Sequence, residues 1–499
     1  MNAQSNEQSR ETNDGLDLAD YSAVALIAAY RAGRLEPVRV TEAVLARIAR
    51  CEPQLQALYA FDAEAARAQA RASAARWQAG APLSIRLGGQ DLTLDGVPLT
   101  LKENIATAGT PMPLGTAASE LTLASEDAPP AARLKELGAV LLAKTTMPDY
   151  GMLSSGLSSF HPLTRNPWDL SKNPGGSSSG AAAAAAAGYG PLHLGTDIGG
   201  SVRLPAAWCG VFTLKPSLGR VPIKPPYAGR VAGPMTRTVA DAALMMAALA
   251  RPDWRDGMSL PHQQIDWLSL CGARPLDAAS AAERLQGLRI GLLMDAGWGL
   301  RVEPEIAAAV EAAAALFAAH GAQIERLAPG SLCTRAMMDG LDAFWRMRSW
   351  LDISALPAER RERVLPYIRA WVDRGERLSA AELFHGYSQI AAIRDRCIAA
   401  CQPYDYVLSP VSPVSAFPAA WASPINDPER PFEHIAFTLP YNMSEQPAAS
   451  INCGYTAAGF PIGLQIAGRR HDDLGVLRVA QAYETLRGPQ RAWPAPGLR

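Results

Sequence analysis

The chain has 499 residues, with 47 Lys and Arg against 48 Asp and Glu and a formal net charge of -1. A hydrophobic fraction of 48% supplies material for a large core, which excludes a wholly disordered or collagen-like chain. Because the charge is nearly balanced and no long basic run occurs, we expect neither nucleic acid nor a membrane surface as a partner.

No targeting segment, disulfide framework or metal site is evident in the sequence. Residues 1–20 are polar and lack the apolar core of a signal peptide. The longest apolar run, 181–187, is far shorter than the ~20 residues of a membrane span. The seven cysteines form no CxxC pair and the seven histidines form no HExxH motif. We therefore expect a cytoplasmic protein with reduced thiols and no metal.

Helices and strands alternate along the chain. Apolar residues at three- and four-residue spacing predict two N-terminal helices that pack on the core, whereas short apolar runs predict buried strands. The predicted elements are helices at 21–32, 40–50, 130–137 and 304–320, and strands at 96–101, 139–143 and 288–293. The first of these strands ends beside Lys102. This alternation predicts an α/β fold with a mixed, largely parallel sheet.

The region 335–435 differs in character, because aromatic residues are spread over predicted helices that are followed by Pro-rich loops. Two interpretations stay open for these aromatic side chains: packing inward against the core, or forming a wall of a substrate pocket. The residues concerned are Trp345, Trp350, Tyr367, Trp371, Phe384 and Tyr387.

The segment 173–203 carries the chemistry. Two Gly-Gly-Ser turns, ending at Ser177 and Ser201, bracket an Ala-rich helix. Glycines before a serine let backbone N–H groups converge on an anion or a developing oxyanion. A phosphate cradle is excluded by spacing, because neither GxxxxGK[ST] nor GxGxxG occurs there. A GxSxG elbow centred on Ser178 is disfavoured because a polar loop, 165–174, stands where that motif needs a strand.

The whole segment resembles the amidase signature family, whose members have a GGSS[GS]G turn, then a GTDxGGS[IV]R turn, and a lysine on an upstream strand. The spacings between Lys102, Ser177 and Ser201 are close to those of the family. Further blocks resemble the family at 101–104, 143–147, 165–168, 205–210, 214–217, 446–450 and 459–465. The departures are Ser179, Ala181 and Glu103, where members more often have Gly, Ser and Asp.

This resemblance implies a single large domain whose central sheet is covered by helices on both faces. It also implies how the chain is divided. The expected parts are N-terminal helices at 1–75, a catalytic core at 76–245, a variable elaboration that shapes the pocket at 246–434, and the C-terminal part of the core at 435–499.

The resemblance further implies a catalytic triad. Ser201 would be the nucleophile, Ser177 the bridging serine that relays a proton, and Lys102 the final base. The peptide bond before Ser177 would be cis. Because lysine is charged in water, with a pKa near 10.4, Lys102 can act as a base only if burial lowers that pKa. Lys144 and Lys215 are rival bases, but their surroundings indicate framework residues.

The remaining site residues follow from the same resemblance. The N–H groups of Ile198, Gly199, Gly200 and Ser201 would form the oxyanion hole. Met152, with Ser177, would lie beside the reacting carbonyl. Asp197 and Arg203 are interpreted as a structural charge pair that holds the turn. No metal or organic cofactor is expected.

The leading functional prediction is hydrolysis of a small-molecule amide C–N bond through an acyl-enzyme, with an aryl or otherwise apolar substrate. Carbamates and oligoamides are alternative substrates. Another alternative is the glutaminase subunit of a tRNA-dependent amidotransferase, which needs partner subunits. A catalytically silent binding protein is disfavoured because Lys102, Ser177 and Ser201 are all present. A homodimer formed through the N-terminal helices stays open.

Overall fold

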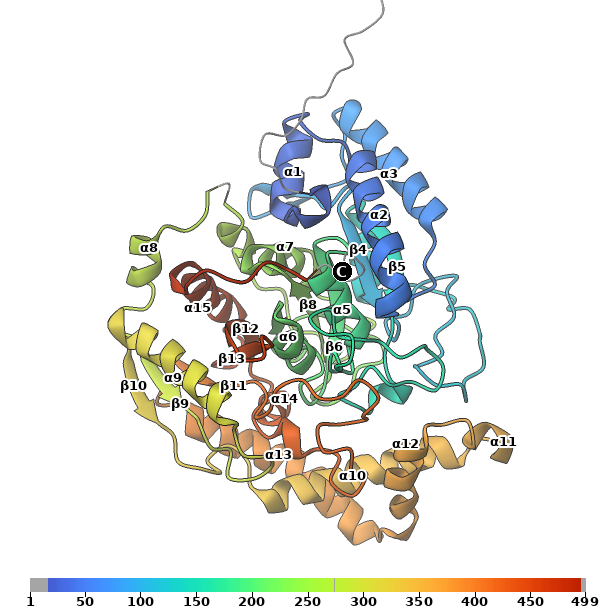
Figure 1. Ribbon diagram of the computed structural model, residues 1–499, viewed down its shortest axis with the longest axis vertical. Helices are drawn as coiled ribbons and strands as arrows, with labels where there is room; N and C mark the ends of the chain where they lie inside the picture. The colour runs from blue at the N-terminus through green and yellow to red at the C-terminus, as the bar shows by residue number, and fades with distance from the viewer. Residues whose placement is uncertain (1–16, 273, 495–499) are drawn as a thin grey trace, which may run out of the picture.

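An eleven-stranded sheet runs through the molecule, with the N-terminal helices at one end and the helices α10 to α13 at the other (Figure 1). This computed structural model describes residues 17–272 and 274–494; most of the N-terminal segment discussed above, 1–16, lies outside them. Within the described ranges, every helix is too short or too polar to span a bilayer.

The strand order of the sheet is β1-β5-β4-β6-β8-β7-β12-β13-β11-β9-β10. A separate two-stranded sheet is formed by β2 (Ile85–Leu87) and β3 (Gln90–Leu92). The strands of the main sheet are β1 Leu58–Tyr59, β4 Pro98–Lys102, β5 Val140–Thr145, β6 Leu192–Asp197, β7 Phe212–Lys215, β8 Val231–Thr236, β9 Arg289–Leu292, β10 Gln323–Arg326, β11 Tyr406–Pro410, β12 Ala448–Tyr455 and β13 Pro461–Gly468.

The sheet is mixed, as predicted, but its parallel pairs are confined to two blocks. Strands β5, β4 and β6 are parallel to one another, and so are β11, β9 and β10. The pairs that run from β6 through β8, β7, β12 and β13 to β11 are antiparallel. More of the neighbouring strand pairs are therefore antiparallel than the sequence led us to expect. The physical reason is that β7 leads to β8, and β12 to β13, without an intervening helix.

Helices cover both faces of the sheet, which confirms the predicted architecture. Residues of α1, α4, α7, α9 and α15 join the largest hydrophobic cluster on one face, while α2, α3, α5 and α6 pack on the other. The helices are α1 Ala23–Arg31, α2 Pro37–Leu55, α3 Ala63–Gln78, α4 Pro129–Glu136, α5 Ser179–Ala187, α6 Arg203–Cys209, α7 Val239–Leu249, α8 Ala278–Glu283, α9 Pro304–Ala319, α10 Arg335–Ser354, α11 Ala358–Arg361, α12 Pro366–Val372, α13 Ala380–Cys401, α14 Leu439–Met443 and α15 Asp473–Leu486.

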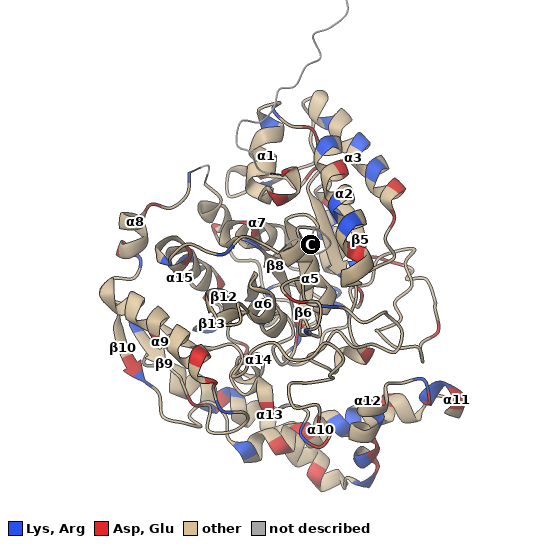
Figure 2. Ribbon diagram, in the orientation of Figure 1, with Lys and Arg blue, Asp and Glu red and all other residues tan. Residues whose placement is uncertain are grey.

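Charged residues lie mainly on the outer helices. Figure 2 shows both signs of charge interspersed over α3, α10 and α13, and none on α5. All nine residues of α5 are buried, and seven of them are alanines. A helix without bulky or charged side chains can lie close against the sheet, so its first turn reaches the strands directly.

The start of α5 lies very close to the backbone beside β1 and β5. A Cβ atom added to Gly180 would lie 2.2 Å from the Ala57 carbonyl oxygen and 2.5 Å from the Thr146 nitrogen. Backbone atoms of this kind cannot move aside as a flexible side chain can. Gly180 therefore sets how closely α5, and the serines that precede it, approach the ends of β1 and β5.

We expect Gly180→Ala to lower the free energy of unfolding by about 1 to 3 kcal/mol, because overpacking against backbone outweighs the gain in helix propensity. Urea denaturation measures the change. Gly257→Ala is the matched control, since Gly257 has no atom within 4 Å of the added Cβ. Equal stabilities of Gly180→Ala and the wild type would contradict the packing argument.

Candidate functional site

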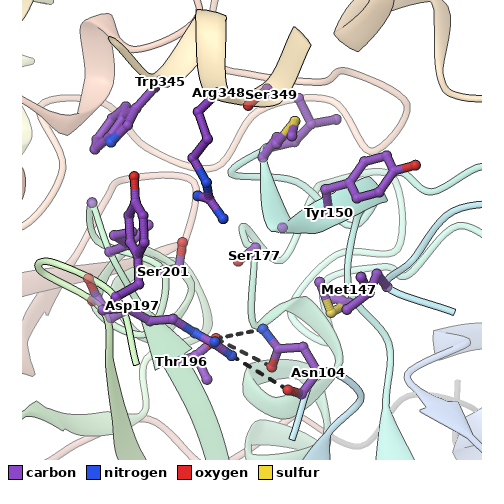
Figure 3. Close-up of a pocket in the computed structure, with 18 of the residues that line it drawn as sticks. Asn104, Met147, Tyr150, Ser177, Thr196, Asp197, Ser201, Trp345, Arg348 and Ser349 are labelled. Carbon is purple, nitrogen blue, oxygen red and sulfur yellow. Dashed lines mark hydrogen bonds between the residues drawn. The ribbon is translucent and has the colours of Figure 1, made fainter. Parts of the chain in front are cut away.

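A cavity of about 480 Å³ opens where the turn before α5, the turn between β6 and α6, and the helix α10 meet (Figure 3). Ser177 and Ser201 both line it, as does Met152. Its other polar and charged lining residues are Asn104, Ser154, Thr196, Asp197, Arg230, Arg348, Ser349 and Asp352. The sequence-predicted serines are thus brought to one cavity from two separate turns.

Lys102 reaches the first of these serines from beneath the cavity. The alternation along β4 turns Leu99 and Leu101 into the large hydrophobic cluster, so Lys102 faces the opposite side, where α5 packs. Its side chain is fully buried. The Lys102 Nζ donates hydrogen bonds to Ser177 Oγ at 2.8 Å and to Ser178 Oγ at 3.0 Å.

Burial lowers the pKa of Lys102 well below its ordinary value, and the positive charge of Arg230 lowers that pKa further. The carboxylates of Asp197 and Glu103 act in the opposite sense, without offsetting the effect of burial. Among the described residues, no carboxylate forms an ion pair with Lys102. The direction of the shift agrees with the uncharged amine that the sequence led us to expect.

Ser177 and Ser178 are neighbours with different surroundings. The Ser178 hydroxyl is fully buried, donates to the Thr196 carbonyl at 3.1 Å, and accepts from Lys102 and from the Thr196 N–H. Ser177 faces the cavity and follows a cis peptide bond from Gly176. Because Ser178 is enclosed and its proton is already donated, the structure argues against the elbow interpretation centred on it.

The second turn is held by Asp197 at the end of β6. Its carboxylate accepts the N–H of Gly200 at 2.7 Å and that of Val202 at 3.1 Å, and it pairs with both Nε and Nη2 of Arg203. Burial alone would raise the pKa of Asp197, but the Arg203 guanidinium brings that pKa below its usual value. Asp197 therefore stays charged, and the turn is fastened as the sequence predicted.

The same turn presents three unoccupied amide donors. Among the described residues, no acceptor lies on the N–H of Ile198, Gly199 or Ser201, and all three residues line the cavity. The N–H of Gly200 is different, since it donates to Asp197. The predicted oxyanion set is therefore corrected at Gly200, whose amide fastens the turn and is not free for a ligand.

Ser201 completes the turn at the cavity wall. Its carbonyl accepts the Ser178 N–H at 3.1 Å, which ties the turn to the beginning of α5. No hydrogen bond joins the hydroxyls of Ser177 and Ser201 among the contacts of the described ranges.

The rival lysines lie away from the cavity. Lys144 donates to the Ile105 carbonyl and to Thr107 Oγ1, the latter at 2.7 Å, and Lys215 donates to the Pro216 carbonyl at 2.9 Å. Burial lowers the pKa of each to about 7. Neither amine reaches a cavity-lining serine, so a lowered pKa alone does not identify a base.

The aromatic residues of the region 335–435 fall into three groups, and two of these groups fit the interpretations that the sequence left open while the third is exposed. Trp345 and Trp371 line the cavity and make edge contacts with Phe432, at centroid distances of 5.5 and 5.4 Å. Phe384 and Tyr387 are instead 73% and 56% exposed. The remaining two, Trp350 and Tyr367, pack on the hydrophobic cluster beside the cavity.

Sequence reasoning missed the two arginines of the cavity, Arg230 and Arg348. Arg230 immediately precedes β8, and Arg348 lies on α10, more than a hundred residues later. No spacing rule connects them, so only the folded chain could place them together. Of the described residues, none form a cluster of His, Cys, Asp or Glu able to hold a metal ion.

Comparison with known proteins gives consistent matches over nearly the whole chain. A profile of the amidase family matches residues 39–477. A glutamyl-tRNA(Gln) amidotransferase subunit of Roseiflexus sp. is 35% identical, over 91% of this chain and 93% of its own length. An acylamidase of Rhodococcus erythropolis is 32% identical, over 96% and 98% of the two chains. A solved bacterial aryl acylamidase of the amidase signature family superposes with a TM-score of 0.83 at 28% identity, covering 96% and 99%.

The buried amine makes a prediction about stability against pH. Between the lowered pKa of folded Lys102 and its ordinary value near 10.4, the unfolded chain binds one more proton than the folded chain. The free energy of unfolding should therefore rise with pH across that window. In Lys102→Met this contribution is absent, so the wild type should gain stability relative to the variant as pH rises. Urea denaturation at several pH values measures the difference.

Lys144 and Lys215 are common to both proteins, so their contributions cancel in this comparison. Parallel stability profiles of the wild type and Lys102→Met would contradict a lowered pKa of Lys102. We also expect Lys102→Met to be the more stable protein at neutral pH, because methionine has no charged form that burial disfavours.

Proposed function

This chain belongs to the amidase signature family of amide-hydrolysing enzymes, and we propose that it cleaves a small aryl or otherwise apolar amide through an acyl-enzyme on Ser201. The observation that carries the proposal is the hydrogen bond from the buried Lys102 amine to Ser177, on the wall of the cavity that Ser201 shares. An uncharged amine in this position can accept the proton that a serine nucleophile must lose.

Proton transfer would run from Ser201 to Ser177 and from Ser177 to Lys102. The Ser201 Oγ forms a bond to the amide carbon as its proton passes to Ser177, whose own proton passes to the Lys102 Nζ. An amide nitrogen leaves only when it is protonated, so the same path returns a proton to it as the C–N bond breaks. Water then attacks the acyl-enzyme by the same route and releases the acid.

The three unoccupied amides would stabilise the negative charge that develops on the substrate oxygen. Each well-placed donor is worth about 3 kcal/mol in the transition state. Donors that are already held in position cost no reorganisation during the reaction, and the Asp197 carboxylate provides that support through Gly200 and Val202. Asp197 would therefore act as a positioning residue for the donors.

The walls of the cavity favour an apolar group next to the amide. Trp345, Trp371 and Phe432 line the cavity, as do Met147 and Met152, and Met152 packs in the same hydrophobic cluster as the three rings. Flat aromatic groups gain from edge and stacking contacts with such rings, and thioethers adapt to their shape. The similarity to an aryl acylamidase supports the same substrate class. Carbamates and oligoamides share the reacting group and stay alternative substrates.

A glutaminase subunit is a second candidate, because a relative 35% identical to this chain belongs to a glutamyl-tRNA(Gln) amidotransferase. Glutamine is a small polar amide without an aromatic group. The indole and phenyl rings of Trp345, Trp371 and Phe432 have no evident use in binding it. This contrast gives the two candidates different substrate preferences that can be measured directly.

A fluorophosphonate probe that labels active serines tests the assignment of the nucleophile. We expect peptide mapping to find the label on Ser201, and Ser201→Ala to prevent labelling. Ser178→Ala should still be labelled at Ser201, whereas Lys102→Ala should label at least about a hundredfold more slowly, since a general base is lost. A label on Ser178, or normal labelling of Lys102→Ala, would contradict the proposed triad.

A panel of amides tests the substrate class with the purified chain alone. We expect the value of kcat/KM for acetanilide to exceed that for glutamine by at least about a hundredfold, because aryl burial contributes about 3 kcal/mol. Hexanamide and phenyl carbamate cover the alkyl and carbamate alternatives. Preference for glutamine, or activity that requires co-purifying subunits, would favour the amidotransferase candidate.

A further inference from the structure

Two guanidinium groups of the cavity have no carboxylate partner. Arg230 and Arg348 both line the cavity, and neither forms an ion pair with an acidic residue among those described. The neighbouring Arg346, on the same helix as Arg348, is paired with Asp342, and Arg203 below the cavity is paired with Asp197. Arg348 is exposed, so its charge stays hydrated, whereas Arg230 is only partly exposed. Two cations that line one cavity without a paired carboxylate create a positive potential there, which favours an anionic ligand.

Arg348 is held in place by an aromatic ring. Its guanidinium lies over the ring of Tyr227, 4.1 Å from the centroid. Figure 3 shows its side chain descending from α10 into the cavity, toward Ser177 and Ser201. A stacked guanidinium keeps its plane fixed while its N–H groups remain available, which reduces the entropy lost when a ligand binds.

Arg230 approaches from the loop before β8. It donates to the Pro225 carbonyl at 3.0 Å and more weakly to the Asn104 carbonyl at 3.5 Å, so its protein partners are neutral. Burial lowers the pKa of Arg230 to about 10, and the charge of Arg348 contributes in the same direction. Both cations line the same cavity, so an anion bound there would interact favourably with each of them.

The acidic residues nearby do not neutralise this pair. Asp352 lies one turn beyond Arg348 on α10 and lines the same cavity, but it is not within ion-pair distance of either arginine. Asp256 interacts favourably with Arg230, but only at long range, and its carboxylate is occupied by the N–H groups of Ile223 and Met258. Asp197 is committed to Arg203.

We propose that Arg348 and Arg230 bind a carboxylate on the substrate, which makes this enzyme an amidase for small aryl or apolar amides that carry an anionic group. The inference rests on the proposed function and adds the charge of the substrate to it. A guanidinium recognises a carboxylate through two parallel hydrogen bonds, which gives both affinity and a defined orientation. The carboxylate would be anchored above the serines, while the aromatic wall contacts the apolar part.

Matched pairs of amides test the proposal. The first pair is 4-acetamidobenzoate and the neutral 4-acetamidobenzamide, which place the group on the amine side. The second pair is N-phenylsuccinamate and N-phenylsuccinamide, which place it on the acyl side. In one of the two pairs, we expect kcat/KM for the carboxylate substrate to be at least about tenfold higher than kcat/KM for its neutral counterpart. A charge-assisted hydrogen bond usually contributes a factor of this size.

Arg348 variants should change this preference. In Arg348→Gln the ratio of the two kcat/KM values should fall toward one, and in Arg348→Lys it should be intermediate, because lysine keeps the charge and loses the paired geometry. Arg363→Gln is the matched control, since Arg363 is an exposed arginine after α11 that does not line the cavity. This control should keep the wild-type ratio, which separates direct binding from a general loss of positive charge.

Binding to Ser201→Ala separates this inference from the proposed function. Calorimetry with the same four amides should give tighter binding of one carboxylate than of its neutral counterpart, whether or not the wild type hydrolyses it. Selective binding without hydrolysis would overturn the proposed function and leave the anion site standing. Equal kcat/KM and equal affinity within both pairs, or an unchanged preference in Arg348→Gln, would overturn the anion site.

Discussion

The amino group of Lys102 is buried, no carboxylate of the described residues pairs with it, and the rest of the site depends on this constraint. Two serine hydroxyls accept its hydrogen bonds, and they can do so only because α5 lies directly against the sheet. This close packing of α5 on the sheet in turn requires Gly180 and the alanines that follow it. A chain of small residues thus positions an amine whose burial lowers its pKa, and the lowered pKa makes the amine suitable as a base.

One buried carboxylate near the site, that of Asp197, forms an ion pair with a buried arginine. Asp197 is paired with Arg203, which also donates to the Thr438 carbonyl and to the side chains of Gln465 and Asn442. This network connects the turn after β6 to residues more than two hundred positions later. It fixes the amides that face the cavity, and it keeps the negative charge of Asp197 from restoring the positive charge of Lys102.

The outer wall of the cavity comes from other parts of the chain than the turns that carry the serines. Its residues come from α10, α12 and the loop before α14, in the part of the chain that carries the exposed charges of Figure 2. Trp345 and Arg348 lie three residues apart on one face of α10, so a single helix brings an aromatic surface and a cation to the same cavity. In the proposed function, reaction chemistry and substrate selection would therefore depend on separate segments of the chain.

Local patterns determined much of this protein from the sequence alone: the helices over α1, α2, α4 and α9, the strand that ends at Lys102, and the two Gly-Gly-Ser turns with their serines. Such features depend on residues close together in the chain, where periodicity and turn chemistry act. Only the tertiary structure decided which of Ser177 and Ser178 faces the cavity, that the Gly200 amide is occupied, that the middle of the sheet is antiparallel, and that Arg230 and Arg348 line one cavity. Each of these depends on contacts between segments distant in sequence, and no short-range pattern records such contacts.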